Sequence, residues 1–131
     1  MKRDIMNSPF TAIGGAEMID ELVNAFYKRV AKHPDLAPIF PDDLTETARK
    51  QKQFLTQFLG GPALYSEEHG HPMLRARHLK FPIGPRQAKA WLSCMHEAME
   101  EVSLDPDYRE GIFRRLTLTA HHMVNLEDEN S

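Results

Sequence analysis

One stretch of this chain, residues 74–83, reads Leu74-Arg75-Ala76-Arg77-His78-Leu79-Lys80-Phe81-Pro82-Ile83. His78 stands four residues after Leu74, so the two side chains would share one face of a short helix. Further apolar residues follow at once, and Pro82 breaks the helical pattern. The stretch therefore predicts an imidazole in an apolar wall, with the cation of Arg77 beside it.

An imidazole in such surroundings is what an iron porphyrin needs from a protein. The ring nitrogen ligates the iron, apolar side chains such as Leu74 and Phe81 cover the macrocycle, and cations meet the propionates. A hydrogen-bonded histidine of an ordinary core is the alternative for His78 taken alone. Other segments of the chain must decide between the two interpretations.

The bulk properties of the chain narrow the classes of protein to which it can belong. Its 131 residues are predicted to form one domain, 1–131, because domains of roughly 100–200 residues are typical. Hydrophobic residues make up 41% and charged residues 27%, as is usual for a soluble globular protein. The net charge of −3 argues against a nucleic-acid partner, since binding a phosphate backbone requires an excess of basic residues.

Two further features concern the cellular compartment. Cys94 is the only cysteine, so an internal disulfide is excluded, which fits a reducing cytoplasm. No signal-peptide pattern follows the first residues, and no stretch approaches the ~20 apolar residues of a membrane span. We therefore expect a cytoplasmic protein that does not insert into a membrane.

The apolar residues recur at helical spacing along the whole chain. Four longer segments, near 18–33, 41–58, 85–102 and 106–126, carry them three and four residues apart. Short helical or turn segments are predicted at 35–40 and 72–79, and a loop at 63–71. The second long helix is expected to open at Pro41-Asp42-Asp43 with an acidic cap and to stop at Gly60-Gly61-Pro62. No alternating strand pattern is present, so the predicted fold class is all-α.

The apolar residues at helical spacing form a stripe along one side of each helix, and polar side chains occupy some positions of these stripes. Thr47 and Gln51 lie on the stripe of the second helix, Tyr27 flanks the first, and Trp91 lies on the inward face of the third. An unpaired buried amide costs about 1–3 kcal/mol, so Gln51 must bond a core group, reach water or face a ligand. Taken singly, each of these residues could also be an ordinary surface or core side chain without a ligand. Together with His78, they suggest hydrogen-bond donors opposite a metal ligand, as a bound diatomic gas with a partly negative outer atom requires.

At this point the chain resembles the group II truncated haemoglobins, over roughly residues 12–126. The matching segments are Phe26-Tyr27-Lys28-Arg29-Val30, Pro38-Ile39-Phe40-Pro41, Phe58-Leu59-Gly60-Gly61-Pro62, His69-Gly70-His71-Pro72-Met73-Leu74-Arg75-Ala76-Arg77-His78, and Ala90-Trp91-Leu92-Ser93-Cys94-Met95. The resemblance implies a shortened globin, in which two antiparallel helix pairs sandwich one haem b (iron protoporphyrin IX) in a two-over-two arrangement. The first globin helix would be nearly lost.

The resemblance also implies roles for particular residues. His78 would be the proximal iron ligand, and Tyr27 and Trp91 would be distal donors to the bound ligand. Thr47 and Gln51 would be the distal residues of the helix that crosses above the haem. Thr47 stands where ordinary globins have a histidine, which would leave the iron pentacoordinate and open. The pocket would also include the rings of Phe40, Phe54 and Phe58, and Lys50 and Arg77 would be propionate partners.

Two functions would use these same residues. The first is binding of O₂ and of other small ligands (NO, CO, sulfide or cyanide), for oxygen storage, transport or sensing. The second is a haem enzyme, a nitric oxide dioxygenase or a peroxidase, which would need an external reductase. A haem-free helical interaction module is a third interpretation, and it leaves Tyr27, Gln51 and His78 unexplained. By the same resemblance we expect a monomer or weak homodimer.

Overall fold

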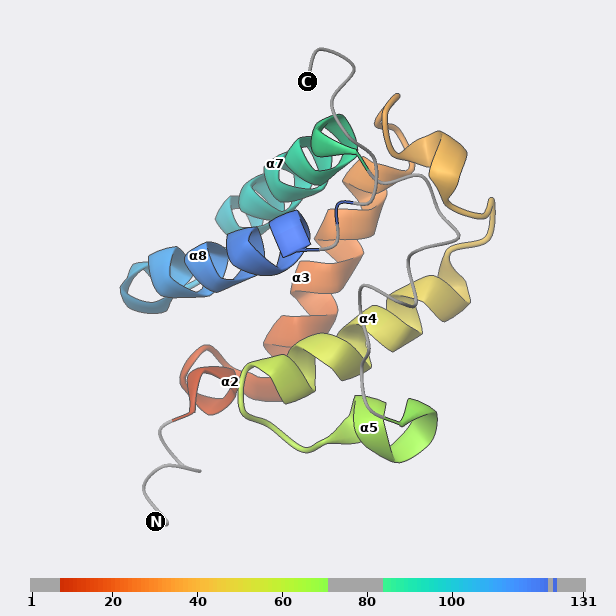
Figure 1. Ribbon diagram of the computed structural model, residues 1–131. Coiled ribbons are helices and arrows are strands. Elements are labelled where there is room, and N and C mark those ends of the chain that lie inside the picture. The colour runs from red at the N-terminus through yellow and green to blue at the C-terminus, as the bar shows by residue number, and fades with distance from the viewer. Residues whose placement is uncertain (1–7, 71–83, 123, 125–131) are drawn as a thin grey trace.

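The structure is a computed structural model that describes residues 8–70, 84–122 and 124 (Figure 1). Every regular element in these residues is helical, which confirms the predicted all-α class. The four long helices are α3 (Gly15–Val30), α4 (Thr45–Phe58), α7 (Pro85–Glu101) and α8 (Pro106–His122). The short elements are α2 (Pro9–Ala12), the 3₁₀ helix η1 (Ala37–Ile39) and α5 (Leu64–His69). The short helix predicted at 72–79 lies outside the described residues.

Helix α3 is the element that joins the two halves of the fold. It packs against α7, which in turn packs against α8, and on its other side it packs against α4, which carries α5. Figure 1 shows α7 and α8 side by side and α4 crossing below them. The apolar residues that recur at helical spacing in α3 are buried as expected, namely Ile19, Leu22, Val23, Phe26 and Val30, whereas Met18 is half-buried. Side chains that are wholly excluded from solvent include Val23, Phe26, Val30, Leu55, Met95, Ala98, Met99 and Leu104.

The ends of the helices follow the proline and glycine signals in most places. Helices α7 and α8 begin at Pro85 and Pro106, as predicted. Helix α4 begins at Thr45, later than predicted, with Leu44 as its N-cap. The Asp43 carboxylate does accept a hydrogen bond from the backbone N–H of Thr45, at 2.9 Å. The acidic residue thus satisfies an amide at the helix start, but it lies outside the helix itself.

The prediction of a loop at 63–71 was wrong, because residues 64–69 form helix α5. Tyr65 is buried there, with its ring edge-on to that of Phe54 on α4 at 5.9 Å. No side chain of α5 caps its own first turn. Instead the Gln57 side-chain oxygen, on α4, accepts a hydrogen bond from the Ser66 N–H at 2.8 Å. The cap therefore comes from a neighbouring helix, which local sequence patterns do not reveal.

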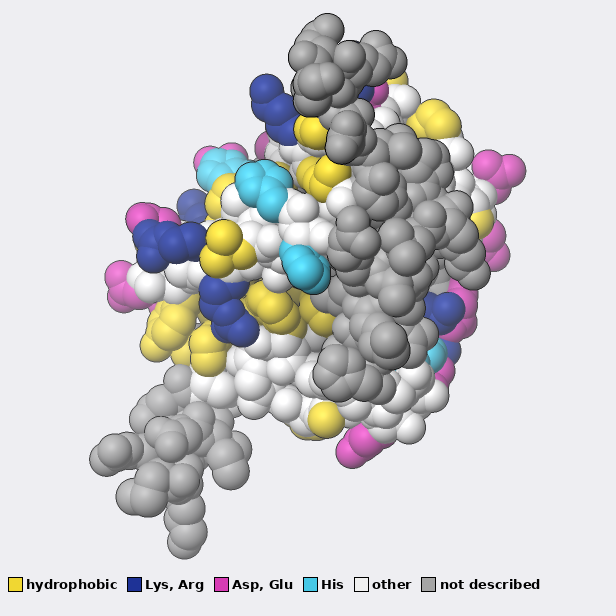
Figure 2. Space-filling model, in the orientation of Figure 1, with side chains coloured by type: hydrophobic (Ala, Val, Ile, Leu, Met, Phe, Trp, Pro, Cys, Tyr) yellow, Lys and Arg dark blue, Asp and Glu magenta, His cyan; other side chains and the backbone are white. Residues whose placement is uncertain are grey.

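The surface of the described residues mixes both signs of charge. In Figure 2, Lys and Arg side chains lie near Asp and Glu side chains at the edges of the described part of the visible face. This mixture of signs agrees with the small net charge of −3. Among the helices of the described residues, none has both the length and the apolar content that crossing a membrane requires.

Candidate functional site

A row of aromatic rings connects α3, η1 and α7 in the interior. Phe26 is at its centre and is wholly buried; its ring lies 5.0 Å from that of Trp91 and 4.8 Å from that of Tyr27, both edge-on. The Tyr27 ring in turn meets that of Phe40, which ends η1, at 6.0 Å. Edge-to-face contacts of this kind fix ring orientations as well as burying apolar area. The fold thus brings Tyr27, Phe40 and Trp91, which are far apart in the sequence, into one cluster.

Tyr27 is the most constrained polar residue of this cluster. Only 7% of its surface is exposed, and burial raises the pKa of its hydroxyl well above the ordinary value of 10. The phenol therefore remains protonated and can donate a hydrogen bond at any physiological pH. No side chain or backbone group of the described residues accepts that hydrogen bond. Every fully buried side-chain nitrogen or oxygen of these residues has a partner, so the unpartnered Tyr27 hydroxyl is not fully enclosed by them.

Thr47 and Gln51 lie on a different element, helix α4. Both are half-buried, and they share a helix face with Phe54 and Phe58, whose rings stack at 5.4 Å. No hydrogen bond or ring contact within the described residues joins this face to Tyr27 or Trp91. The structure therefore confirms neither their convergence nor their ligand-binding role, which stay predictions.

Arg115 of α8 contacts Phe58 at the end of α4, and the sequence did not predict this contact. The Arg115 guanidinium, from α8, lies 4.3 Å above the Phe58 ring and donates a hydrogen bond to the Phe58 carbonyl at 3.0 Å. It satisfies a carbonyl at the end of α4 and covers an aromatic face. No sequence signal distinguishes Arg115 from other exposed cations. Lys50, a predicted propionate partner, is exposed on α4.

Four of the predicted site residues cannot be placed. His78, Leu74, Arg77 and Phe81 lie outside the described residues. The described part of the chain contains no group of three His, Cys, Asp or Glu side chains able to hold a metal ion. Cys94 is buried, and burial raises the pKa of its thiol, as in a structural side chain rather than a nucleophile.

Comparison with known proteins shows the family. Residues 8–125 match the bacterial-like globin family. The chain is 65% identical over 128 residues to the group 2 truncated hemoglobin YjbI of Bacillus subtilis, which covers 95% of this chain and 96% of the relative. The crystal structure of the group II truncated hemoglobin from Bacillus anthracis is similar with a TM-score of 0.92 and 65% identity, over 95% of both chains.

The truncated oxygen-avid haemoglobin from Bacillus subtilis is similar with a TM-score of 0.88 and 67% identity, over 91% of this chain and 100% of that one. These matches span nearly the whole chain and agree in both sequence and structure. They confirm the predicted family and its two-over-two fold. The chain belongs to the bacterial-like globins, and within them to the group II truncated haemoglobins.

Proposed function

We propose that this protein binds haem b and holds O₂ there with slow release. The observation that carries the proposal is Tyr27, whose ring is buried and whose protonated hydroxyl has no acceptor among the described residues and is not fully enclosed by them. A donor of this kind is available to a ligand or to water. Membership of the globin family implies a haem, and a relative 67% identical to this chain is described as oxygen-avid.

The described residues fit a flat, largely apolar group. The rings of Phe40, Phe54, Phe58 and Trp91 pack against the core yet remain only half-buried. Covering such rings with an apolar macrocycle is favourable, at about 25 cal/mol per Å² of apolar surface buried. The haem would supply an iron atom that takes a diatomic gas, with His78 as its proposed protein ligand. Lys50 and Arg77 are the proposed propionate partners, and Leu74 and Phe81 complete the proposed pocket.

The proposed role of the distal residues is to donate hydrogen bonds to the outer, partly negative atom of the gas. Tyr27, Gln51 and Trp91 each offer one donor side chain, whereas Thr47 is too short to occupy the ligand's place at the iron. Each neutral hydrogen bond contributes about 0.5–1.5 kcal/mol. Two or three would slow release of O₂ by roughly one to three orders of magnitude, at ~1.4 kcal/mol per tenfold. The same donors would interact with NO, and more weakly with CO.

Absorption spectra of the purified protein test haem binding. We expect a Soret band in the wild type, a stable spectrum in the presence of O₂, and loss of the band in His78→Ala. The family assignment makes haem uptake the expected result, and His78 as its ligand is the specific prediction. A wild type that takes up no haem even after reconstitution would overturn the proposal.

Stopped-flow measurement of O₂ dissociation tests the distal donors. Tyr27→Phe combined with Gln51→Leu should accelerate release by about tenfold or more, because two hydrogen bonds are removed. Tyr108→Phe is the matched control, since Tyr108 is a half-buried tyrosine on α8 that is not among the rings in contact with Tyr27. Equal release rates in the double variant and the wild type would refute the proposed role of these donors.

A further inference from the structure

Helix α4 presents three faces with different neighbours. Its apolar face, with Leu55 and Leu59 buried, packs on α3. A second face holds Thr47, Gln51, Phe54 and Phe58. A third face carries only polar side chains at spacings of three and four residues, Glu46, Arg49, Gln53 and Gln57. At 3.6 residues per turn, the second and third faces lie roughly 120° apart around the helix.

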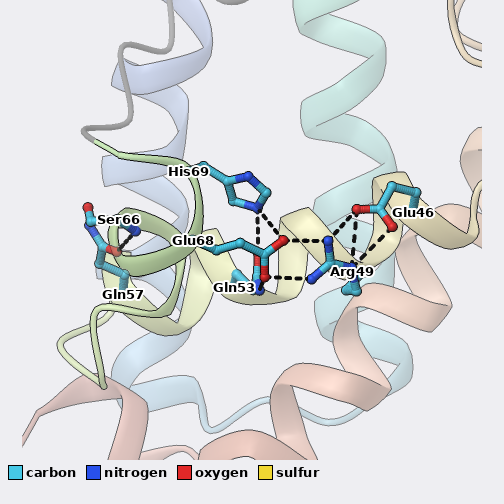
Figure 3. A network of polar contacts seen from close by, with 7 residues as sticks. All are labelled: Glu46, Arg49, Gln53, Gln57, Ser66, Glu68 and His69. Atoms are coloured by element: carbon cyan, nitrogen blue, oxygen red, sulfur yellow. Dashed lines mark hydrogen bonds and ion pairs between the residues drawn. The ribbon is translucent and has the colours of Figure 1, made fainter.

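Arg49 is the centre of the polar face. Its guanidinium donates to the Glu46 carboxylate one turn earlier, with the Nε bonds at 3.1 Å. It also donates through both terminal nitrogens to Glu68 on α5, at 2.8 and 2.6 Å, so that the contact between the helices is bidentate. Figure 3 shows the guanidinium held between the two carboxylates. A fork of parallel bonds to a carboxylate fixes direction as well as distance, unlike a single lysine contact.

Two glutamines extend this contact along α4. The Gln53 amide donates to Glu68 at 2.9 Å, and its oxygen lies 2.8 Å from the His69 Nε2. Eight residues beyond Arg49, the Gln57 amide donates to the Ser66 hydroxyl at 2.7 Å and accepts from its backbone N–H at 2.8 Å. Arg49 and Gln57 are therefore about 12 Å apart along the helix axis. Contacts at two such separated points fix how α4 is rotated relative to α5.

We propose that Arg49, with Glu68 and Gln53, is a positioning unit that sets the rotation of α4 and thereby aims Gln51 at the haem ligand. The inference rests on the proposed function of Gln51. Exposed ion pairs add little stability on their own, but a network with bidentate geometry is the exception. The Arg49 guanidinium holds the pKa of the Glu68 carboxyl at about 2, so this carboxylate stays charged across the physiological range.

The size of the effect follows from helix geometry. Side-chain tips lie about 5–6 Å from a helix axis, so a rotation of ~10° moves them by about 1 Å. A displacement of that size lengthens a hydrogen bond of normal length beyond its useful range. Helix α4 packs on α3 through the buried Leu55 and Leu59, and the Lys52–Asp20 ion pair at 3.6 Å joins the same two helices. Dispersion contacts have no preferred direction, so the bidentate contact with α5 adds an orientation that the apolar packing does not specify.

The test compares variants of Arg49 in the haem-loaded protein. Arg49→Ala should accelerate O₂ release by about two- to tenfold, the equivalent of one neutral hydrogen bond. It should also shift the C–O stretching band of the CO complex to higher wavenumber and broaden it, because the donor near the ligand becomes displaced. Arg49→Lys, which keeps the charge and loses the fork, should give an intermediate band. Arg114→Ala, which breaks an exposed ion pair within α8 at 2.9 Å, is the matched control and should change neither reading.

A double-variant cycle separates positioning from general destabilisation. Because Arg49 is proposed to act through Gln51, Arg49→Ala should have no further effect on O₂ release in a Gln51→Leu background. Additive effects of the two substitutions, or an unchanged C–O band in Arg49→Ala, would overturn the inference and leave the proposed function standing. An unchanged rate of O₂ release in Gln51→Leu would also overturn the inference about Arg49. Failure of the wild type to bind haem would instead overturn the proposed function.

Discussion

At the scale of single residues, Tyr27 differs from a tyrosine at a solvent edge in both its surroundings and its titration. Its ring is fixed by Phe26 and Phe40, and burial raises the pKa of its hydroxyl from 10. Above about pH 10 the Tyr27 phenol loses its proton in the unfolded chain but keeps it in the folded protein. The folded state is therefore disfavoured as the pH rises past that value, and not below it.

This predicts an alkaline loss of stability that Tyr27 causes. The free energy of unfolding of the wild type should fall between pH 9 and pH 11, and Tyr27→Phe should show a shallower fall, as measured by urea denaturation. Tyr108→Phe serves as the control for removing a hydroxyl. Parallel profiles for the wild type and Tyr27→Phe would mean that burial does not hold this phenol in its protonated form.

At the scale of elements, the turn after α4 is where α2 docks. The Gly60 backbone has φ +94°, which an L-residue adopts only with strain, and the Phe10 N–H donates to the Leu59 carbonyl at 2.9 Å. A Cβ on Gly61 would lie 2.8 Å from the Phe10 ring and 2.9 Å from the Thr56 carbonyl oxygen. The backbone of this turn therefore has no room for a side chain at residue 61.

Two glycine substitutions should have opposite effects for this reason. Gly61→Ala should lower the free energy of unfolding by about 1–3 kcal/mol, as overpacking does. Gly111→Ala should raise it by about 0.5–1 kcal/mol, because Gly111 lies inside α8 with open space around its Cα. Thermal and urea denaturation followed by circular dichroism measure both. Equal stability of the two variants would contradict the packing described at this turn.

At the scale of the whole molecule, ion pairs among the described residues connect α3 with α7, α4 with α5 and α4 with α3. Lys28 and Arg29 on α3 reach Glu101 on α7 at 3.0 and 2.7 Å, and Arg49 joins α4 to Glu68 on α5. These cations lower the pKa of both glutamates, that of Glu68 to about 2. A carboxyl whose pKa is lower when folded stabilises the protein above its unfolded pKa of about 4.5, and that contribution disappears as the pH falls towards the folded value.

The whole protein should consequently lose stability under acid conditions. The urea midpoint of the wild type should be constant from pH 7 to about pH 5 and fall between pH 4.5 and pH 2. A variant with both Glu68→Gln and Glu101→Gln should have a lower midpoint at pH 7 and a flatter acid profile. A midpoint that is the same at pH 6 and pH 3 in the wild type would show that these pairs do not contribute to folding.

The amino-acid sequence by itself determined the helical class, most helix ends and the family. Helical periodicity of apolar residues is a local property, and Gly84-Pro85, Asp105-Pro106 and Gly60-Gly61 act on the backbone of their own neighbours. The candidate residues on α3, α4 and α7 were also chosen from the sequence, because polar groups on apolar stripes are visible there. The apolar residues at helical spacing in α3 are buried as predicted, apart from the half-buried Met18.

Only the tertiary structure decided the features that depend on distant partners. Helix α5 forms although its residues lack a cap, because Gln57 on α4 supplies one and Phe54 covers Tyr65. The ring row through Phe26, the Arg115 contact with Phe58 and the bidentate Arg49–Glu68 pair join residues from separate helices. Such contacts depend on how helices are placed in space, and one-dimensional spacing carries no information about that placement.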